Sequence, residues 1–295
     1  MISILIPTYN YNIFPLVFSL YEQVKALNIE YEIIGLDDAS KKYHSENQKI
    51  NDLAHCSYSI LEKNIGRSAI RNLLAKKARF ENLLFLDADV LPIHNDFISN
   101  YIPHINSNVK VIYGGIRYQE QRPEKDQILR WVYGKSREAL TADVRNQNPY
   151  LAFLTLNFMI QKSVFESVSF NEEIPNLRHE DTLFSYELKK AGVSMLHIEN
   201  PVCHNGLESS QVFLRKSEES LVGLDYLIKN RLIESEYVKL SVAYKKLEKY
   251  KLKGIYLAFY RTFKSGFLKN LLGKQPSLLI FDLFRLGYFC DLNTK

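Results

Sequence analysis

Short apolar segments of strand length alternate with segments of helical spacing over the first third of this 295-residue chain. The expected strands are 2–6, 31–36, a short one near 57–61, and 83–86, and the expected helices are 14–27 and 68–79. Strands joined through helices run parallel, so the pattern predicts a doubly wound α/β sheet with right-handed crossovers. Open sheets of this kind bind ligands beyond the carboxyl ends of their strands, and a site is expected there.

Acidic residues follow the predicted strands at this edge of the sheet. The apolar run 82–86 leads into Asp87-Ala88-Asp89. Paired carboxylates suit a hard metal ion, so a metal site is one interpretation of Asp87 and Asp89. A plain turn is the other, because Asp bonds its own backbone and ends strands well. Taken alone, the short motif leaves both interpretations open.

The turn after the first strand excludes two common nucleotide sites. It reads Pro7-Thr8-Tyr9-Asn10 and holds no glycine, whereas a dinucleotide-binding fold places G-x-G-x-x-G there. A phosphate-cradling Walker loop is missing from the sequence as well. The ligand must therefore be held in another way.

The strand and helix pattern loosens after residue 113. Gly114-Gly115 is interpreted as a flexible joint, and 126–140 as a helix that contains the only tryptophan, Trp131. An apolar strand pattern resumes within 151–161. A helix follows at 181–191 with Gly192 as its C-cap, and a strand at 194–198 runs on to His204.

Composition and cysteine spacing indicate an ordinary globular chain. The hydrophobic fraction of 46% is ample for a packed core. The three cysteines are widely spaced and form no C-x-x-C pair, which favours a reducing compartment over a disulfide framework or a zinc site. Segment 1–7 is too short for a signal peptide, and no uncharged apolar run reaches the length that spans a bilayer. We therefore expect a cytoplasmic protein.

The net charge of +5 is unevenly distributed along the chain. Residues 239–295 hold 12 Lys or Arg and three acids, which leaves 26 basic and 30 acidic residues elsewhere. Basic residues interleaved with Tyr, Phe and Leu favour peripheral contact with anionic lipid at the inner face of the membrane. A C-terminal helical bundle with solvated lysines is the alternative, and both stay open. Nucleic acid is not expected as a partner, because the basic residues do not flank the sheet.

Five short motifs together resemble the family 2 glycosyltransferases in order and spacing. They are PTYN at 7–10, LDDAS at 36–40, NIGRSAIRN at 64–72, FLDAD at 85–89 and HED at 179–181. The resemblance covers roughly residues 1–206 and implies the GT-A fold, an α/β class with a mostly parallel central sheet. It divides the chain into a catalytic domain at 1–210, with a nucleotide-sugar half at 1–113 and an acceptor half at 114–210, and a C-terminal helical region at 211–295.

The resemblance also implies which residues hold the sugar donor. The nucleotide base would be lined by Pro7, Thr8 and Tyr9, and Asp38 would hydrogen-bond it. The phosphates would be approached by Arg67 and Arg71, and Asp87 would lie near the ribose or the water shell of the metal.

The remaining roles concern the metal and the acceptor. Asp89 would ligate Mg²⁺ or Mn²⁺, with His204 as a further ligand, as in some relatives. Asp181 would be the catalytic base, and its place at the start of a helix would help to keep it ionised. Glu180 and Trp131 would lie on the acceptor side. The segment 127–131 also spells the Gln-x-x-Arg-Trp signature of processive synthases, but it precedes Asp181 instead of following it, so we interpret it as coincidence.

The implied reaction moves a sugar from a nucleotide-diphosphate donor to a hydroxyl of a glycan or lipid-linked saccharide, with inversion and without processivity. A hard cation would neutralise the diphosphate, and a carboxylate base would take the proton of the hydroxyl, which is typically worth about 10²–10⁴ in rate. One departure is Ala39, where the family usually has glycine. A turn that needs positive φ would be strained there.

Three other functions fit parts of the sequence. A sugar-nucleotide pyrophosphorylase shares an α/β core but needs a glycine-rich nucleotide loop, which is absent. A phosphatase of the haloacid-dehalogenase type would carry its Asp-x-Asp near the chain start, with Thr or Val at the position of Leu91. A catalytically inactive, membrane-associated binding protein is the third. The joint presence of Asp38, Asp89 and Asp181 argues against it.

Overall fold

The computed structural model describes residues 1–105, 107–175 and 178–294, and these divide into two units. The first, here called the α/β unit, consists of Met1–Gln119, Glu138–Ile174 and Glu180–Gly206. The second, here called the helical unit, consists of Glu120–Arg137, Pro175–His179 and Leu207–Lys295.

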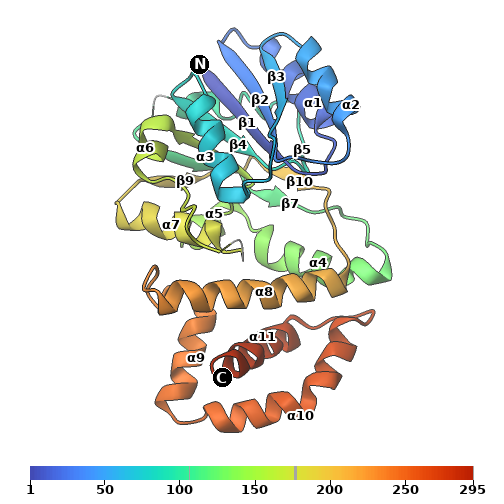
Figure 1. The fold of residues 1–295 in the computed structure, drawn as a ribbon, viewed down its shortest axis with the longest axis vertical. Coiled ribbons are helices and arrows are strands. Elements are labelled where there is room, and N and C mark those ends of the chain that lie inside the picture. Colours follow the sequence, from blue (N-terminus) through green and yellow to red (C-terminus); the bar gives the residue numbers. More distant parts are fainter. Residues whose placement is uncertain (106, 176–177, 295) are drawn as a thin grey trace. The chain divides into compact units, whose positions relative to one another are not determined.

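A seven-stranded sheet forms the centre of the α/β unit, in the order β3-β2-β1-β4-β8-β6-β9 (Figure 1). Its strands are β1 (Ile2–Thr8), β2 (Tyr31–Asp37), β3 (Cys56–Ile60), β4 (Asn82–Leu86), β6 (Val111–Tyr113), β8 (Asn157–Gln161) and β9 (Met195–His197). β8 runs antiparallel to β4 and β6, and the other neighbours are parallel. The prediction of a mostly parallel sheet is confirmed, with β8 as the exception.

Helices cover both faces of this sheet. In Figure 1, α1 (Phe14–Lys25) and α2 (His44–Gln48) lie on one side, and α3 (Arg67–Lys77), α6 (Lys162–Ser167) and α7 (Glu180–Lys190) on the other. Side chains alternate between the faces along each strand. Leu5 and Phe85 pack with α3, whereas Gly35 faces the α1 side, where a Cβ would lie 2.8 Å from Ile13 Cδ1. The short α5 (Ala142–Asn146) lies beside β9.

A second, three-stranded sheet has the order β5-β10-β7. Its strands are β5 (Val90–Pro92), β7 (Ile116–Arg117) and β10 (Val202–His204). β10 pairs antiparallel with β5, which places His204 opposite Val90, the residue after Asp89. The predicted strand from 194 to His204 is thus two strands in two sheets.

Gly114 and Gly115 are packed tightly, so the prediction of a flexible joint is wrong. A Cβ at Gly114 would lie 2.5 Å from Asn157 Nδ2, and that amide donates to the Gly115 carbonyl at 2.9 Å. The fully buried Arg145 donates to the carbonyls of Gly114 and Ile198, at 3.4 and 2.6 Å. The two glycines allow this close approach, because a side chain at Gly114 would displace its neighbours.

The helical unit contains α4 (Ile128–Tyr133), α8 (Ser210–Lys229), α9 (Lys239–Lys249), α10 (Lys253–Leu271) and α11 (Leu278–Leu292). The predicted helix at 126–140 is present as a 3₁₀ turn (Lys125–Gln127), α4 and a π-helical stretch (Gly134–Glu138). Apolar side chains from α4, α8, α10 and α11 form one core in this unit. None of the helices within the described ranges is long and apolar enough to cross a membrane.

Candidate active site

A cavity of about 220 Å³ lies beyond the carboxyl ends of β1, β2 and β4. These three strands are neighbours and parallel, so the residues that follow each of them meet at one edge despite their distance in sequence. The cavity is lined by Pro7, Thr8, Tyr9, Tyr11, Asp38, Arg67, Ile70, Arg71, Asp87, Ala88 and Asp89. The structure therefore brings together all seven residues predicted to hold the donor, with Asp89 beside them, and their roles stay predictions.

The turn after β2 separates the two acids of the Asp-Asp pair. Asp37 is fully buried and accepts hydrogen bonds from the Ser40 amide, at 2.7 Å, and from the Tyr58 hydroxyl. It holds the turn closed and does not line the cavity. Ala39 in this turn has φ 60, so the strain expected at a position where glycine is usual is present.

We expect Ala39→Gly to raise the free energy of unfolding by about 0.5–1 kcal/mol. Glycine adopts positive φ without the cost that a Cβ imposes, although its greater freedom in the unfolded chain offsets part of the gain. The midpoint of urea unfolding measures the effect. Ala26 ends α1 with φ −77 and serves as the matched control, since Ala26→Gly should lower the midpoint. A lower midpoint for Ala39→Gly would contradict the prediction.

Asp38 fixes the loop that leads into α3. Its carboxylate is almost fully buried and accepts from the backbone amides of Ile65, at 2.7 Å, and Gly66, at 3.0 Å. Each carboxylate oxygen has a second lone pair, which leaves acceptor capacity toward the cavity that Asp38 lines. The contact between Asp38 and this loop was not predicted from the sequence.

Arg71 and Asp87 form an ion pair in the wall of the cavity. Arg71 Nη2 donates to Asp87 Oδ1 at 2.7 Å, and Nη1 donates to the Arg67 carbonyl at 3.1 Å. Burial raises the pKa of Asp87, and the charge of Asp89 raises it further, while the Arg71 guanidinium opposes both effects. Arg71 is 5% exposed, so its guanidinium is held in one position.

Glu180 and Asp181 begin α7, and Glu180 reaches the cavity residue Arg67, with Oε1 and Nη1 3.1 Å apart. Asp181 Oδ1 accepts from the Thr182 amide at 2.7 Å. Burial raises the pKa of Asp181 to about 6, and the neighbouring charge of Glu180 adds to the rise. The backbone contact at the helix start lowers the pKa, as expected there, but desolvation outweighs this effect and the net shift is upward.

Asp89 and His204 meet because β5 and β10 pair. His204 Nε2 lies 3.4 Å from Asp89 Oδ2, and the Asn205 amide donates to the Asp89 carbonyl at 2.8 Å. Gly206 passes so close that a Cβ there would collide with the Asp89 carboxylate. Tyr11 lines the same cavity, where burial raises its pKa and the charge of Asp89 adds to the rise.

The Asp89–His204 pair fits a divalent metal of the kind that keeps much of its water shell. Within the described ranges, no three or more His, Cys, Asp or Glu side chains are grouped to hold a metal ion. Asp89 and His204 offer one carboxylate and one imidazole. Mg²⁺ commonly uses one or two protein carboxylates, with waters and substrate phosphates completing its octahedron. The chemistry of this donor set is therefore compatible with an ion shared with a diphosphate.

Trp131 lies on α4 in the helical unit, where Lys135 Nζ is 5.1 Å from its ring centroid. Its predicted role on the acceptor side stays a prediction. Three lining residues of the cavity, Tyr11, Ile70 and Ala88, were not predicted. Their position along the sequence could have indicated them, because each is adjacent to a predicted residue or two positions from one.

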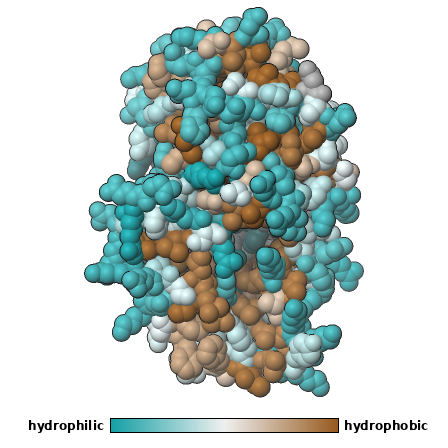
Figure 2. Space-filling model, turned by 180° about the vertical axis from the view of Figure 1, so that it is seen from behind, coloured by the Kyte–Doolittle hydropathy of each residue, from teal (hydrophilic) through white to brown (hydrophobic). Residues whose placement is uncertain are grey.

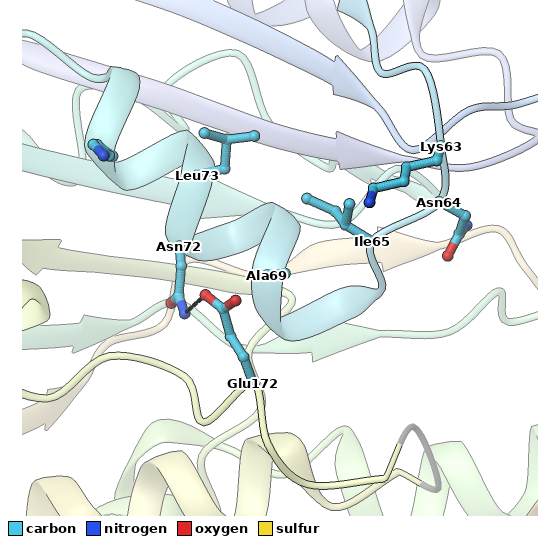
Figure 3. A pocket seen from close by; sticks show the side chains of 8 residues that line it. Lys63, Asn64, Ile65, Ala69, Asn72, Leu73 and Glu172 are labelled. Atoms are coloured by element: carbon cyan, nitrogen blue, oxygen red, sulfur yellow. Dashed lines mark hydrogen bonds between the residues drawn. The ribbon is translucent and has the colours of Figure 1, made fainter.

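A second cavity, of about 570 Å³, lies along α3 (Figure 3). It is lined by Lys63, Asn64, Ile65, Ala69, Asn72, Leu73, Lys76 and Glu172. Asn72 donates to Glu172 Oε1 at 2.7 Å and to the Phe170 carbonyl at 2.8 Å, and it accepts from the Phe170 amide at 3.0 Å. Asn72 closes the NIGRSAIRN motif, and these contacts give it the role of fastening the segment around 170–172 to α3.

Comparisons with known proteins agree with this geometry. The model of the family described as Glycosyl transferase family 2 matches residues 3–169, more than half of the chain. No curated protein sequence matches. Among solved structures, a mannosyltransferase from Pyrobaculum calidifontis, in complex with GDP-Man and Mn²⁺, gives a TM-score of 0.56 at 12% identity, covering 100% of this chain and 88% of that chain.

Two further structures are similar in fold. The 1–349 fragment of S. aureus TarS in complex with UDP-GlcNAc gives a TM-score of 0.52 at 20% identity, covering 75% of this chain and 66% of the fragment. Glucosyl-3-phosphoglycerate synthase from Mycobacterium tuberculosis gives a TM-score of 0.52 at 12% identity, covering 76% of this chain and 78% of that chain. The match covers only 39% of the longer TarS chain.

These likenesses confirm the GT-A fold, an α/β fold with a mostly parallel sheet, that the sequence motifs predicted. The family match confirms that the protein is a glycosyltransferase. The chain belongs to glycosyl transferase family 2.

Proposed function

We propose that the protein transfers a sugar from a nucleotide-diphosphate donor to a hydroxyl of a saccharide acceptor, free or lipid-linked, with inversion at the anomeric carbon. The observation that carries the proposal is the cavity beyond β1, β2 and β4, which gathers aromatic, cationic and acidic side chains at one edge. Structures of similar fold contain UDP-GlcNAc, GDP-Man, or UDP with Mn²⁺, which supports this class of donor.

The cavity residues suit the parts of such a donor. Tyr9 lines the cavity and is 54% exposed, so its ring is accessible for stacking on a nucleotide base. Asp38 supplies acceptor oxygens for the polar edge of the base. Arg67 and Arg71 supply guanidinium groups, whose planar donors match phosphate oxygens. Asp87 orients Arg71 through their ion pair.

Asp89, with His204, would hold the divalent ion. When bound, the ion supplies positive charge that neutralises the diphosphate leaving group. The close backbone at Gly206 confines the Asp89 carboxylate on one side.

Asp181 is the base that we propose for the transfer. Its carboxylate removes the proton of the acceptor hydroxyl while that oxygen bonds to the anomeric carbon, and the bond from this carbon to the diphosphate oxygen breaks. The nucleoside diphosphate leaves with the electron pair of that bond. A carboxyl with a pKa of about 6 is ionised at neutral pH yet basic enough to accept a proton, as general-base catalysis requires.

The proposal is tested by screening the purified protein with nucleotide-diphosphate sugars in the presence of Mn²⁺. We expect one of them to raise the melting temperature, because a ligand that binds the folded state stabilises it. The same compound should release its nucleoside diphosphate slowly, by transfer to water. No stabilisation by any sugar of the uridine, guanosine, thymidine, cytidine or adenosine series would contradict the proposal.

We expect kcat/KM to fall as the pH drops through about 6, because Asp181 must be ionised to accept a proton. Because the pKa is raised, the protonated form persists to higher pH. The acid limb of the pH–rate profile, where activity falls, therefore lies at higher pH than for an ordinary Asp. Glu180→Gln removes a neighbouring negative charge and should shift the limb to lower pH. Glu187→Gln, further along α7, is the matched control and should leave it in place. A limb that does not move in Glu180→Gln would contradict the assignment.

A further inference from the structure

Large apolar side chains are exposed around α10 in the helical unit. Seven of them lie in the segment 250–279, namely Tyr250, Leu252, Ile255, Phe259, Phe263, Leu272 and Leu279. Figure 2 shows brown, hydrophobic side chains at the surface of this unit toward the α10 end, among teal hydrophilic ones. Single exposed apolar residues are ordinary, but a contiguous group marks a contact surface.

Three of these side chains form a stripe along α10. Ile255, Phe259 and Phe263 are spaced by four residues, so they project from one face of the helix over about 12 Å. The ring centroids of Phe259 and Phe263 are 5.0 Å apart. The opposite face of α10 is already used, because Leu257 and Tyr260 are buried in the core of the helical unit.

The charged side chains of the segment that carries the stripe all have one sign. From Lys249 to Phe281 the chain contains seven Lys or Arg and no Asp or Glu. Lys251, Lys269 and Lys274 are exposed, and Lys269 lies almost four helical turns after Ile255, close to the same face. Arg261 is paired with Asp291 of α11, at 2.6 Å, so part of the positive charge is compensated within the unit.

We propose that this face of α10 docks on an anionic lipid surface. Ile255, Phe259 and Phe263 enter the boundary between headgroups and acyl chains, and the surrounding lysines contact the lipid phosphates. A helix with an apolar stripe bordered by lysines binds membranes in this way, lying in the plane of the interface without spanning it.

Charge complementarity favours lipid over a second copy of this chain as the occupant. A symmetric dimer places the same patch against itself, and here that would bring two surfaces with an excess of positive charge together. An anionic bilayer offers both the apolar interior and the opposite charge. The inference rests on the helical unit alone and does not depend on the proposed reaction. It is compatible with a lipid-linked acceptor.

The test is flotation of the full chain with phosphatidylcholine vesicles, with and without phosphatidylglycerol. The protein should float only with the anionic vesicles, and less so at high salt. The double variant Phe259→Ser, Phe263→Ser should lower the partition coefficient more than about tenfold, since it removes two rings that the bilayer would bury. The triple variant Lys251→Gln, Lys269→Gln, Lys274→Gln should lower it by about 10², at roughly fivefold per charge.

Matched controls lie in the α/β unit. Phe18→Ser with Leu151→Ser removes two exposed apolar side chains, and Lys41→Gln, Lys49→Gln, Lys77→Gln removes three exposed charges. Both control variants should float like the wild type. The altered side chains of α10 are exposed, so circular dichroism should show unchanged helix content.

Three outcomes would overturn the inference. One is a wild type that stays with the unbound fraction at low salt. Another is a Phe259/Phe263 variant that floats as well as the wild type. The third is a wild-type dimer in sedimentation that this variant converts to a monomer, since a second copy would then cover the face.

Discussion

Asp181→Asn should lower turnover by about 10²–10⁴ while leaving donor binding intact. An amide has nearly the size of the carboxylate but cannot accept the proton of the acceptor hydroxyl, and this is the range that a lost general base usually costs. The carboxylate lies outside the residues that line the donor cavity, so binding of a nucleotide should change little. Steady-state kinetics combined with calorimetry of the nucleoside diphosphate separates the two effects.

Glu187→Gln, also on α7, provides the control for charge loss on the same helix. Its turnover should match that of the wild type. If Asp181→Asn turns over at a nearly normal rate, another group is the base. If it loses donor binding to the same extent as turnover, Asp181 holds the donor rather than taking the proton.

Asp89→Asn should lower turnover by about 10² or more, and added Mn²⁺ should restore little of the loss. The substitution removes the only carboxylate in the pair that we propose to hold the ion. A metal that neutralises a leaving group is worth several kcal/mol, and a 10²-fold loss corresponds to roughly 2.7 kcal/mol. The measurement is turnover as a function of Mn²⁺ concentration.

Asp96→Asn is the matched control. Asp96 lies seven residues after Asp89 in the sequence, is exposed, and does not line the cavity. It should keep the metal response of the wild type. An Asp89→Asn variant with unchanged activity and an unchanged Mn²⁺ response would remove the role proposed for this residue.

Much of the site could be predicted because it depends on strand ends. The apolar runs ending at Thr8, Asp37 and Leu86 are visible in the sequence, and parallel neighbours place whatever follows them at one edge. The two acids after β4 and the polar residues at the ends of β1 and β2 therefore lie together at the predicted edge of the sheet. The alternation of strands and helices along the sequence was sufficient to predict this part of the site.

Contacts that depend on non-local pairing could not be predicted in the same way. His204 meets Asp89 only because β10 joins a second sheet beside β5, and three-residue strands carry little periodic signal. Antiparallel β8 is a similar case. Its five residues read as an apolar strand, but their direction is set by which neighbours they pair with.

Electrostatic effects at the site were also beyond the sequence. Asp181 begins a helix, which by itself favours the ionised form, and this was the predicted influence. This influence is present in the backbone contact with Thr182, but burial of the carboxyl and the charge of Glu180 outweigh it, so the net pKa is raised. Burial is a tertiary property, and a motif of three letters does not contain it.

The central claim is that the cavity binds a nucleoside diphosphate together with a divalent ion. The most direct test is calorimetric titration of the wild type with UDP and with GDP, each in Mn²⁺ and again in excess chelator. The account predicts saturable binding of at least one of them in Mn²⁺ and much weaker binding of the same nucleotide in chelator. Equal affinity under the two conditions, or no binding in either, would contradict it.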